Sequence, residues 1–128
     1  MKNLPDPGAL LRELVRIPSP SGDESRAAEF CLDLCATHGV DAERVGDCVL
    51  VKLTRGTGPT VFLNSHLDTV PIGKGWTVEP LDVDWKEGRL YGRGSNDAKA
   101  SVAAMLSTSL RVIVCGRRPP HAFTQRSA

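Results

Sequence analysis

The chain has 128 residues, of which 41% are hydrophobic and 24% are charged, values typical of a soluble globular protein with one domain. The formal net charge of +1 gives no indication of a nucleic-acid-binding surface, which usually carries a basic excess. Because no apolar run could span a bilayer and the N-terminus lacks a signal-peptide core, we expect a cytoplasmic protein that contacts neither nucleic acid nor membrane.

The first forty residues predict two helices. Four apolar residues between positions 10 and 17 recur at helical spacing, and Pro18 ends this first pattern. In the second helix, Ser21 and Glu24 have the spacing of a capping box, and Gly39 marks the expected end. His38, in the last turn, is expected to be a surface residue and not a metal ligand.

Strands follow these helices. Three are predicted, over residues 40–45, 48–53 and 60–64. Gly46-Asp47 joins the first two as a hairpin, and Glu87-Gly88 predicts a second hairpin. An Ala-rich helix is expected to begin near Asp97. The pattern predicts an α/β fold in which helices flank a central β-sheet.

The four cysteines do not have the spacing of a disulfide framework or of a soft-metal site. Cys31 and Cys35 share one face of the second helix, whereas Cys48 and Cys115 stand alone. With no secretory context, we expect reduced cysteines in the core.

The charge balance changes abruptly along the chain. Up to Asp97 there are 15 acidic and 11 basic residues, whereas residues 98–128 contain 5 basic residues and no acidic one. We therefore separate residues 1–110 from an anomalous basic tail, residues 111–128. The tail is either disordered or the product of a shifted reading frame. From Pro119 onward we expect it to be poorly ordered or loosely packed, because it has few apolar residues to bury.

The segment "VFLNSHLDTVP" places a histidine and an aspartate at the end of a predicted strand. The apolar run 61–64 predicts an interior strand buried on both faces, with His66 and Asp68 just beyond its C-terminal end. Residues two apart in an extended chain point to the same side. His66 could therefore bind a metal while Asp68 holds the ring or assists a bound water. A histidine that is only hydrogen-bonded at a strand end would give the same pattern.

The segment "GRLYGRGSNDAKAS" forms a second cluster. It does not match a phosphate-binding loop, and Asp97 occupies the place of the third glycine in a dinucleotide fingerprint. Gly92 and Gly94 indicate close backbone approach around Asp97, which is either a ligand or a helix cap. Lys99 is expected to be solvated or to lie beside the helix dipole.

Together these motifs resemble the co-catalytic zinc peptidases and deacylases. This family includes acetylornithine deacetylase, succinyl-diaminopimelate desuccinylase, aminoacylases and glutamate carboxypeptidases. The matching elements are His-x-Asp-x-Val-Pro, the Trp and Pro of "GWTVEP", Gly-Arg-Gly-x-x-Asp-x-Lys and the N-terminal "LLRELVRIPSPSGDE". The resemblance covers residues 4–106.

The resemblance implies a role for each site residue. His66 would bind one of two zinc ions, Asp97 would bridge both, and Asp68 would be the catalytic residue that orients His66 and tunes the metal-bound water. Cobalt could take the place of zinc. Trp76 and Trp85 are expected to pack in the core or at its rim.

Later elements of the family have no counterpart in this sequence. These are a Glu-Glu pair that supplies the general base and a ligand, a further acidic ligand and a distant histidine. No Asp or Glu follows Asp97, and His121 in the basic tail is not expected to be a ligand. The second domain, through which the family dimerises and clamps its substrate, is also without a counterpart. Residues 1–110 are thus expected to be the N-terminal part of a zinc-peptidase-like catalytic domain.

The predicted function is a metal-dependent hydrolase of amide bonds in N-acyl amino acids, similar to acetylornithine deacetylase. Its substrate would be a small N-acyl amino acid or a short peptide. We expect the 128-residue chain to be inactive by itself. One alternative is a di- or tripeptidase or a desuccinylase of the same family. Another is a non-enzymatic product with residual binding of metal or of a partner.

Overall fold

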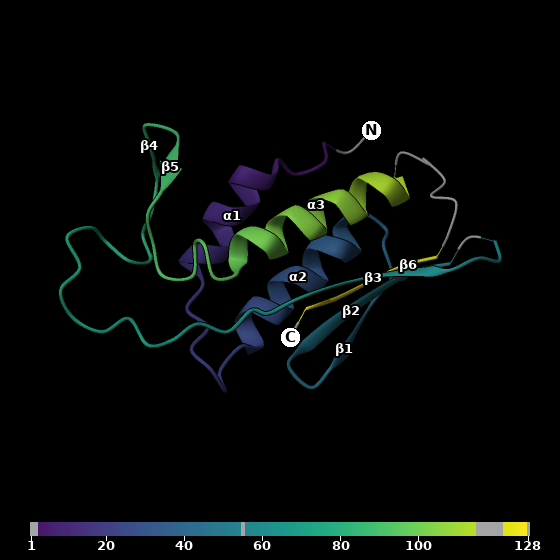
Figure 1. The fold of residues 1–128 in the computed structure, drawn as a ribbon, viewed down its shortest axis with the longest axis horizontal. Coiled ribbons are helices and arrows are strands. Elements are labelled where there is room, and N and C mark those ends of the chain that lie inside the picture. Colours follow the sequence, from purple (N-terminus) through teal and green to yellow (C-terminus); the bar gives the residue numbers. More distant parts are fainter. Residues whose placement is uncertain (1–2, 55, 115–121, 128) are drawn as a thin grey trace.

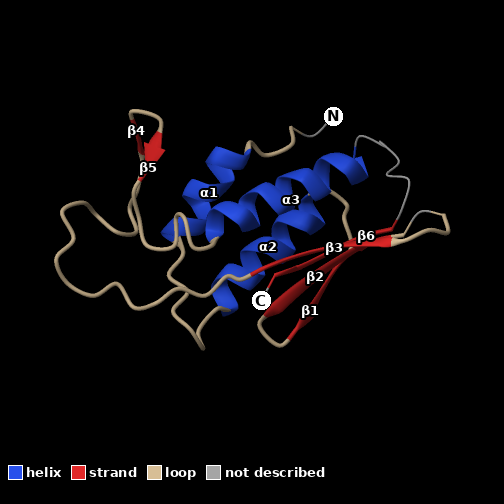
Figure 2. Ribbon diagram, viewed as in Figure 1, coloured by secondary structure: helices blue, strands red, loops and turns tan. Residues whose placement is uncertain are grey.

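Three helices lie on the same side of a four-stranded sheet in the computed structural model, which describes residues 3–54, 56–114 and 122–127 (Figure 1). The helices are α1 (Pro7–Arg16), α2 (Ser25–Thr37) and α3 (Lys99–Val114). The strands are β1 (Ala42–Val45), β2 (Cys48–Leu53), β3 (Thr60–Ser65), β4 (Trp85–Lys86), β5 (Arg89–Leu90) and β6 (Ala122–Ser127). Helices α2 and α3 contact the sheet, and α1 packs on α3. The α/β fold expected from the sequence is confirmed (Figure 2).

The start of helix α1 has a capping side chain and a proline whose φ angle is already close to the helical value. The Asp6 side chain accepts a hydrogen bond from the Ala9 backbone N–H (3.0 Å), and Pro7 occupies the first turn. Leu10 and Leu14 are buried on the face that packs into the core.

Helix α2 does not use the predicted capping box. It begins at Ser25, its N-cap is Glu24, and no side chain caps it. The Glu24 carboxylate accepts a hydrogen bond from the Gly22 backbone N–H (2.8 Å), and the Ser21 hydroxyl donates to the Asp68 carboxylate instead of to the helix. The helix ends as expected before Gly39, which has a φ of +69° that favours glycine.

The sheet has the strand order β1-β2-β6-β3. Strands β1 and β2 pair antiparallel around Gly46-Asp47, so the predicted hairpin is confirmed. Strand β6 runs antiparallel to β2 and parallel to β3, with Ala122 opposite Thr60 and Ser127 opposite Ser65. The separate β4–β5 pair confirms the second predicted hairpin.

The prediction of an interior strand over residues 61–64 is wrong. Strand β3 lies at the edge of the described sheet, and Val61 and Phe62 are 47% and 56% exposed. The helices cover one side of the sheet alone, and β3 has a described neighbour along one edge only. Its apolar side chains are therefore not enclosed. The second part of the prediction is confirmed, because His66 and Asp68 follow directly after the strand ends at Ser65.

Of the expectation that the tail from Pro119 is poorly ordered or loosely packed, the first alternative is corrected for residues 122–127. Residues 115–121 lie outside the described part of the chain, but 122–127 form β6 between β2 and β3. Two strands with open edges give the backbone of this short segment hydrogen-bond partners on both sides. Helix α3 continues to Val114, past the boundary expected at residue 110.

The hydrophobic core lies between the helices and the sheet. Cys31 and Cys35 are buried in it as free thiols, as predicted. Burial raises their pKa values to about 12 and about 11, so both stay protonated at neutral pH. Cys48 is half-buried, and Cys115 lies outside the described residues.

Among the described helices, none combines the length and the apolar character that crossing a membrane requires.

Candidate metal centre

His66 and Asp68 project from an extended segment that continues β3. Burial alternates along it: Ser65, Leu67 and Thr69 are buried, whereas His66 and Asp68 are half-exposed on the opposite side. This alternation is the period of an extended chain. As predicted, the imidazole and the carboxylate therefore share one open side at the end of the strand.

Asp97 reaches the same place from the loop before α3. Its Oδ1 atom lies 2.9 Å from Nε2 of His66, although 31 residues separate the two positions. Helix α3 begins at Lys99, two residues later than expected, so Asp97 lies outside the helix. The Asp97 carboxylate therefore contacts His66, and its role as a metal ligand stays a prediction.

Two glycines bring this loop close to its neighbours. A Cβ atom on Gly94 would lie 2.6 Å from Cγ2 of Thr69, and one on Gly92 would lie 2.7 Å from Cγ1 of Val15. Real Cβ atoms do not approach carbon this closely. Gly94 also has a φ of +80°. The predicted close backbone approach is therefore confirmed.

Asp68 holds the other side of the His66 ring. Its Oδ1 atom and its backbone oxygen each lie 3.1 Å from Nδ1 of His66. Its second carboxylate oxygen, Oδ2, accepts a hydrogen bond of 2.5 Å from the Ser21 hydroxyl. Both acceptors at Nδ1 require a hydrogen on that nitrogen, so Nε2 is the atom available to a metal ion.

The local charges shift the pKa values of His66 and Asp68 in opposite directions. Partial burial would lower the pKa of His66, but hydrogen bonds to the Asp68 carbonyl and the Asp97 carboxylate, and both negative charges, raise it above 6.5. The hydrogen bond from Ser21 is the main cause that lowers the pKa of Asp68, and it outweighs the opposing effect of burial. Without a metal, a protonated His66 is thus stabilised between two carboxylates.

The donor set fits a zinc or cobalt ion but does not complete a site. Neutral imidazole and carboxylate are ordinary zinc ligands, with bonds of about 2.0–2.2 Å. A shared ion would replace the hydrogen bond between His66 and Asp97. Within the described ranges, no group of three or more His, Cys, Asp or Glu side chains could hold a metal. His66 and Asp97 alone offer two ligands.

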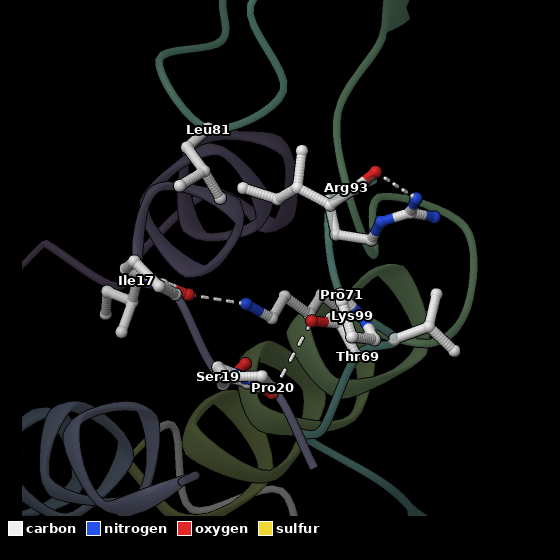
Figure 3. A pocket seen from close by; sticks show the side chains of 11 residues that line it. Ile17, Ser19, Pro20, Thr69, Pro71, Leu81, Arg93 and Lys99 are labelled. Atoms are coloured by element: carbon white, nitrogen blue, oxygen red, sulfur yellow. Dashed lines mark hydrogen bonds between the residues drawn. The ribbon is translucent and has the colours of Figure 1, made fainter. Parts of the chain in front are cut away.

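The three residues line one open cavity of about 370 Å³. Thr69, Val70 and the loop 92–96 form the rest of its wall. A second, mostly apolar cavity of about 240 Å³ shares Thr69 and Val70 with it. This cavity extends towards Pro20 and Leu81 (Figure 3). The candidate centre therefore opens to solvent beside an apolar recess.

Lys99 contradicts the expectation of a solvated lysine. It is 1% exposed, and its Nζ atom donates to the backbone oxygens of Leu14 (2.8 Å) and Ile17 (2.7 Å) at the end of α1. Figure 3 shows the bond to Ile17. Burial lowers its pKa to about 8. These oxygens belong to the last turn of a helix, where a cation is favoured. Lys99 thus joins the start of α3 to the end of α1.

The remaining candidates lie apart from the centre. His38 contacts backbone oxygens of Leu34 (2.9 Å) and Asn3 (3.4 Å), in agreement with a surface role. Trp76 is half-buried, donates to the Ile72 oxygen (2.7 Å) and stacks on a neighbouring arginine. Trp85 is 44% exposed on β4, so it packs at a rim and not in the core. His121 falls outside the described residues.

Sequence reasoning missed Ser21 as a neighbour of the centre. The only local signal was its spacing to Glu24, which indicated a helix cap. The contact with Asp68 spans 47 residues of sequence. For Lys99 the sequence predicts a solvated side chain or one beside the helix dipole, and no local signal indicates its burial.

Comparisons with known proteins identify the family that this chain resembles. The model of peptidase family M20/M25/M40 matches residues 62–124. Succinyl-diaminopimelate desuccinylase 2 of Ruegeria sp. (strain TM1040) is 34% identical over 115 residues, which cover 84% of this chain and 29% of the relative. Succinyl-diaminopimelate desuccinylase of Methylococcus capsulatus is 36% identical over 107 residues, 80% of this chain and 28% of the relative.

Solved structures show the same fold. The metallo-carboxypeptidase Sso-CP2 of Sulfolobus solfataricus superposes with a TM-score of 0.79 at 19% identity, over 96% of this chain and 30% of its own. Human carnosine dipeptidase 1 gives a TM-score of 0.75 at 24% identity, over 91% and 30%. The chain thus spans about a third of the length of these relatives. By its motifs, its fold and its relatives, the chain belongs to peptidase family M20/M25/M40.

Proposed function

We propose that this chain carries part of the metal centre of a hydrolase that cleaves amide bonds in N-acyl amino acids. The observation that carries the proposal is the position of His66, whose Nδ1 faces Asp68 and whose Nε2 faces Asp97. This arrangement supplies one oriented imidazole and one carboxylate on the open side of a cavity. The named relatives that hydrolyse acyl amino acids or peptides support the assignment of the reaction class.

Each of the three residues has a separate task in the proposal. Nε2 of His66 and the carboxylate of Asp97 would hold zinc, or cobalt in its place, and Asp97 would be shared with a second ion in a complete centre. A bound metal polarises an amide carbonyl and lowers the pKa of a bound water. Asp68 keeps the hydrogen on Nδ1, so that Nε2 presents its lone pair. The orientation of the ring is therefore fixed before metal binds.

The sequence-based expectation and the named relatives differ in the acyl group of the substrate. Acetylornithine deacetylase was the sequence-based expectation, whereas two curated relatives are named succinyl-diaminopimelate desuccinylases. Both substrates are small N-acyl amino acids with a second charged group. We propose this shared class as the substrate, with the succinyl group as the first to test.

The 128-residue chain alone is proposed to lack turnover at an enzyme-like rate. No acidic residue follows Asp97 in the sequence, so none can be assigned to the family's later carboxylate roles. A positioned general base contributes about 10²- to 10⁴-fold to such reactions. With two ligands and no assigned base, residual binding of metal is the second candidate function.

Dimerisation and a cytoplasmic location remain predictions.

Metal binding and turnover test the two candidates together. Zinc titrated calorimetrically into the chain should bind with a stoichiometry of about one, and His66→Ala and Asp97→Ala should each remove most of the affinity. His38→Ala, which changes a histidine outside the centre, should bind like the wild type. N-succinyl-diaminopimelate and N-acetylornithine should be hydrolysed below about 1 s⁻¹, the low end of ordinary enzymes.

Two results would overturn these statements. Equal zinc affinity in the wild type and in both ligand variants would remove the metal centre. Turnover above about 1 s⁻¹ that is lost in His66→Ala would show that residues within this chain complete the site.

A further inference from the structure

The loop between α1 and α2 is fastened along the segment that carries Asp68. The Ser19 hydroxyl donates to the Leu67 oxygen (2.7 Å), and the Thr69 N–H donates to the Ser19 oxygen (2.8 Å). The Ser21 N–H then donates to the Thr69 oxygen (3.1 Å), and Pro20 forms a parallel bridge with Thr69. Two segments that are far apart in sequence thus run side by side with a fixed register.

Because of this register, the Ser21 side chain reaches the candidate metal centre. The Ser21 hydroxyl lies 2.5 Å from Oδ2 of Asp68, while Oδ1 of the same carboxylate lies 3.1 Å from Nδ1 of His66. The opposite ring nitrogen is 2.9 Å from Asp97. A continuous chain of contacts therefore leads from Ser21 through Asp68 and His66 to Asp97.

The hydrogen bond from Ser21 settles the orientation of a group that is otherwise loosely defined. Rotation of a carboxylate about its bond to Cβ has broad, shallow minima, so the rotamer of Asp68 does not fix the plane of the carboxylate relative to His66. A short, charge-assisted bond to Oδ2 leaves Oδ1 for the imidazole. Asp68 has a side chain that is 35% exposed, so water would compete for Oδ2 if no hydroxyl were held there.

The donor itself is held from both sides. At the start of the loop, Nζ of Lys99 binds the oxygens of Leu14 and Ile17. After Ser21, the Asp23 N–H closes a turn on the Pro20 oxygen (2.8 Å). Because the backbone is fixed on either side, little conformational entropy is lost when the hydroxyl binds the carboxylate.

We propose that Ser21 is a positioning residue of this metal centre. Its hydroxyl orients the Asp68 carboxylate, and through it the His66 ring, so that Nε2 faces Asp97 and the metal. The inference rests on the proposed function for the identity of the ligand. The geometry among Ser21, Asp68 and His66 is independent of any metal.

Two measurements on Ser21→Ala, Ser21→Thr and Ser19→Ala test the proposal. The first is zinc affinity by calorimetry. The second, on metal-free protein at an alkaline pH where the ring is neutral, is the tautomer ratio of His66 from its side-chain ¹⁵N chemical shifts. Ser19→Ala is the matched control, because it removes a hydroxyl of the same loop that binds a backbone oxygen instead of the carboxylate.

The expected results separate positioning from loosening of the loop. Losing a direct partner of a metal ligand typically costs about 10- to 100-fold in affinity. Ser21 acts one contact further away, so Ser21→Ala should weaken zinc binding about 3- to 10-fold and shift His66 towards the Nε2–H tautomer. Ser21→Thr, which keeps the hydroxyl, should restore both values. Ser19→Ala should leave the tautomer ratio at the wild-type value.

Other outcomes are equally decisive. An unchanged tautomer ratio in Ser21→Ala, or the same shift in Ser19→Ala, would overturn the positioning role. If the wild-type chain binds no zinc but Ser21→Ala still shifts the tautomer, the proposed function fails while the role of Ser21 in orienting His66 stands.

Discussion

His66 and Asp97 meet at 2.9 Å across 31 residues of sequence, and the contact joins Nε2 to Oδ1. The ring is turned so that its other nitrogen is already occupied by Asp68. When His66 is protonated, its Nε2–H group can donate to Asp97 at the place where a zinc ion would bind both residues. A proton on Nε2 and a metal ion therefore compete for the same nitrogen of His66.

Zinc affinity should rise with pH. The pKa of His66 is raised above 6.5 by its neighbours, so the ring is protonated in the metal-free protein up to a higher pH than a free histidine. Binding must displace this proton, and below the shifted pKa the affinity should increase about tenfold per pH unit. Calorimetry between about pH 6 and pH 8 would measure the slope. A flat profile would mean that zinc does not bind through His66.

The same shifts predict how folding stability depends on pH. A raised pKa means that the folded state holds the His66 proton more tightly, so this contribution is full below 6.5 and is lost as the pH rises through the folded value. The lowered pKa of Asp68 stabilises the fold above 3.8, and this is lost as the pH falls through its folded value. Urea denaturation of the wild type and His66→Gln should therefore differ more at pH 6 than at alkaline pH.

Asp68→Asn should weaken zinc binding about 10- to 100-fold, because it removes the charge that holds the hydrogen on Nδ1 while keeping the side-chain shape. Asp41→Asn, which removes an exposed carboxylate outside the centre, is the control for net charge. Affinities measured for the two variants under identical ionic strength would settle the point. Equal affinities would show that Asp68 does not orient the ligand.

Lys99→Met should destabilise the fold by about 1–3 kcal/mol, because two backbone oxygens at the end of α1 lose a buried donor. The folded pKa of about 8, compared with 10.5 unfolded, also means that the unfolded chain binds more protons between these values. The wild type should therefore gain stability relative to Lys99→Met as the pH rises from 8 to 10.5.

The opposing effect of Cys35 cancels in this comparison, because Cys35 is present in both proteins. Cys31 interacts with the Lys99 charge, which lowers the pKa of its thiol, so both proteins are compared in a Cys31→Ala background. Lys86→Met, on the exposed β4–β5 hairpin, is the control for the loss of a charge. A difference between wild type and Lys99→Met that does not change with alkaline pH would contradict the burial of an ionisable Lys99.

Gly94→Ala should disturb the centre more than a strained backbone alone would. Gly94 has a φ of +80°, and an added Cβ would meet Thr69 at 2.6 Å. Gly73 has a φ of +73° with no atom within 4 Å, so Gly73→Ala carries the backbone cost of about 1–2 kcal/mol without the clash. Thermal unfolding should show a larger loss for Gly94→Ala, and zinc binding should weaken in that variant alone. Similar losses in both would contradict the close approach.

The parts of the fold set by local pattern could be predicted from the sequence. The hairpin at Gly46 follows from a glycine at positive φ between two alternating segments. The shared side of His66 and Asp68 follows from the two-residue period of an extended chain. Asp97 could be named as a candidate, because two glycines and a helix start surround it.

Features that depend on distant contacts could not be predicted in this way. Ser21 has a local pattern that fits a cap, and its contact with Asp68 exists only once two loops lie side by side. Lys99 is buried because the end of α1 offers backbone oxygens, which no local composition reveals. The exposure of Phe62 depends on which faces of the sheet are covered, and an apolar run does not specify this.

The most direct test of the central claim is the side-chain ¹⁵N spectrum of the histidines during a zinc titration. The sequence contains three histidines, so His66 can be assigned by comparison with His66→Gln. We predict that zinc shifts the Nε2 resonance of His66 into the metal-bound range, leaves its Nδ1 protonated, and has no such effect on His38. A shift at Nδ1 of His66, or a metal-bound signal at another histidine with His66 unchanged, would contradict the account.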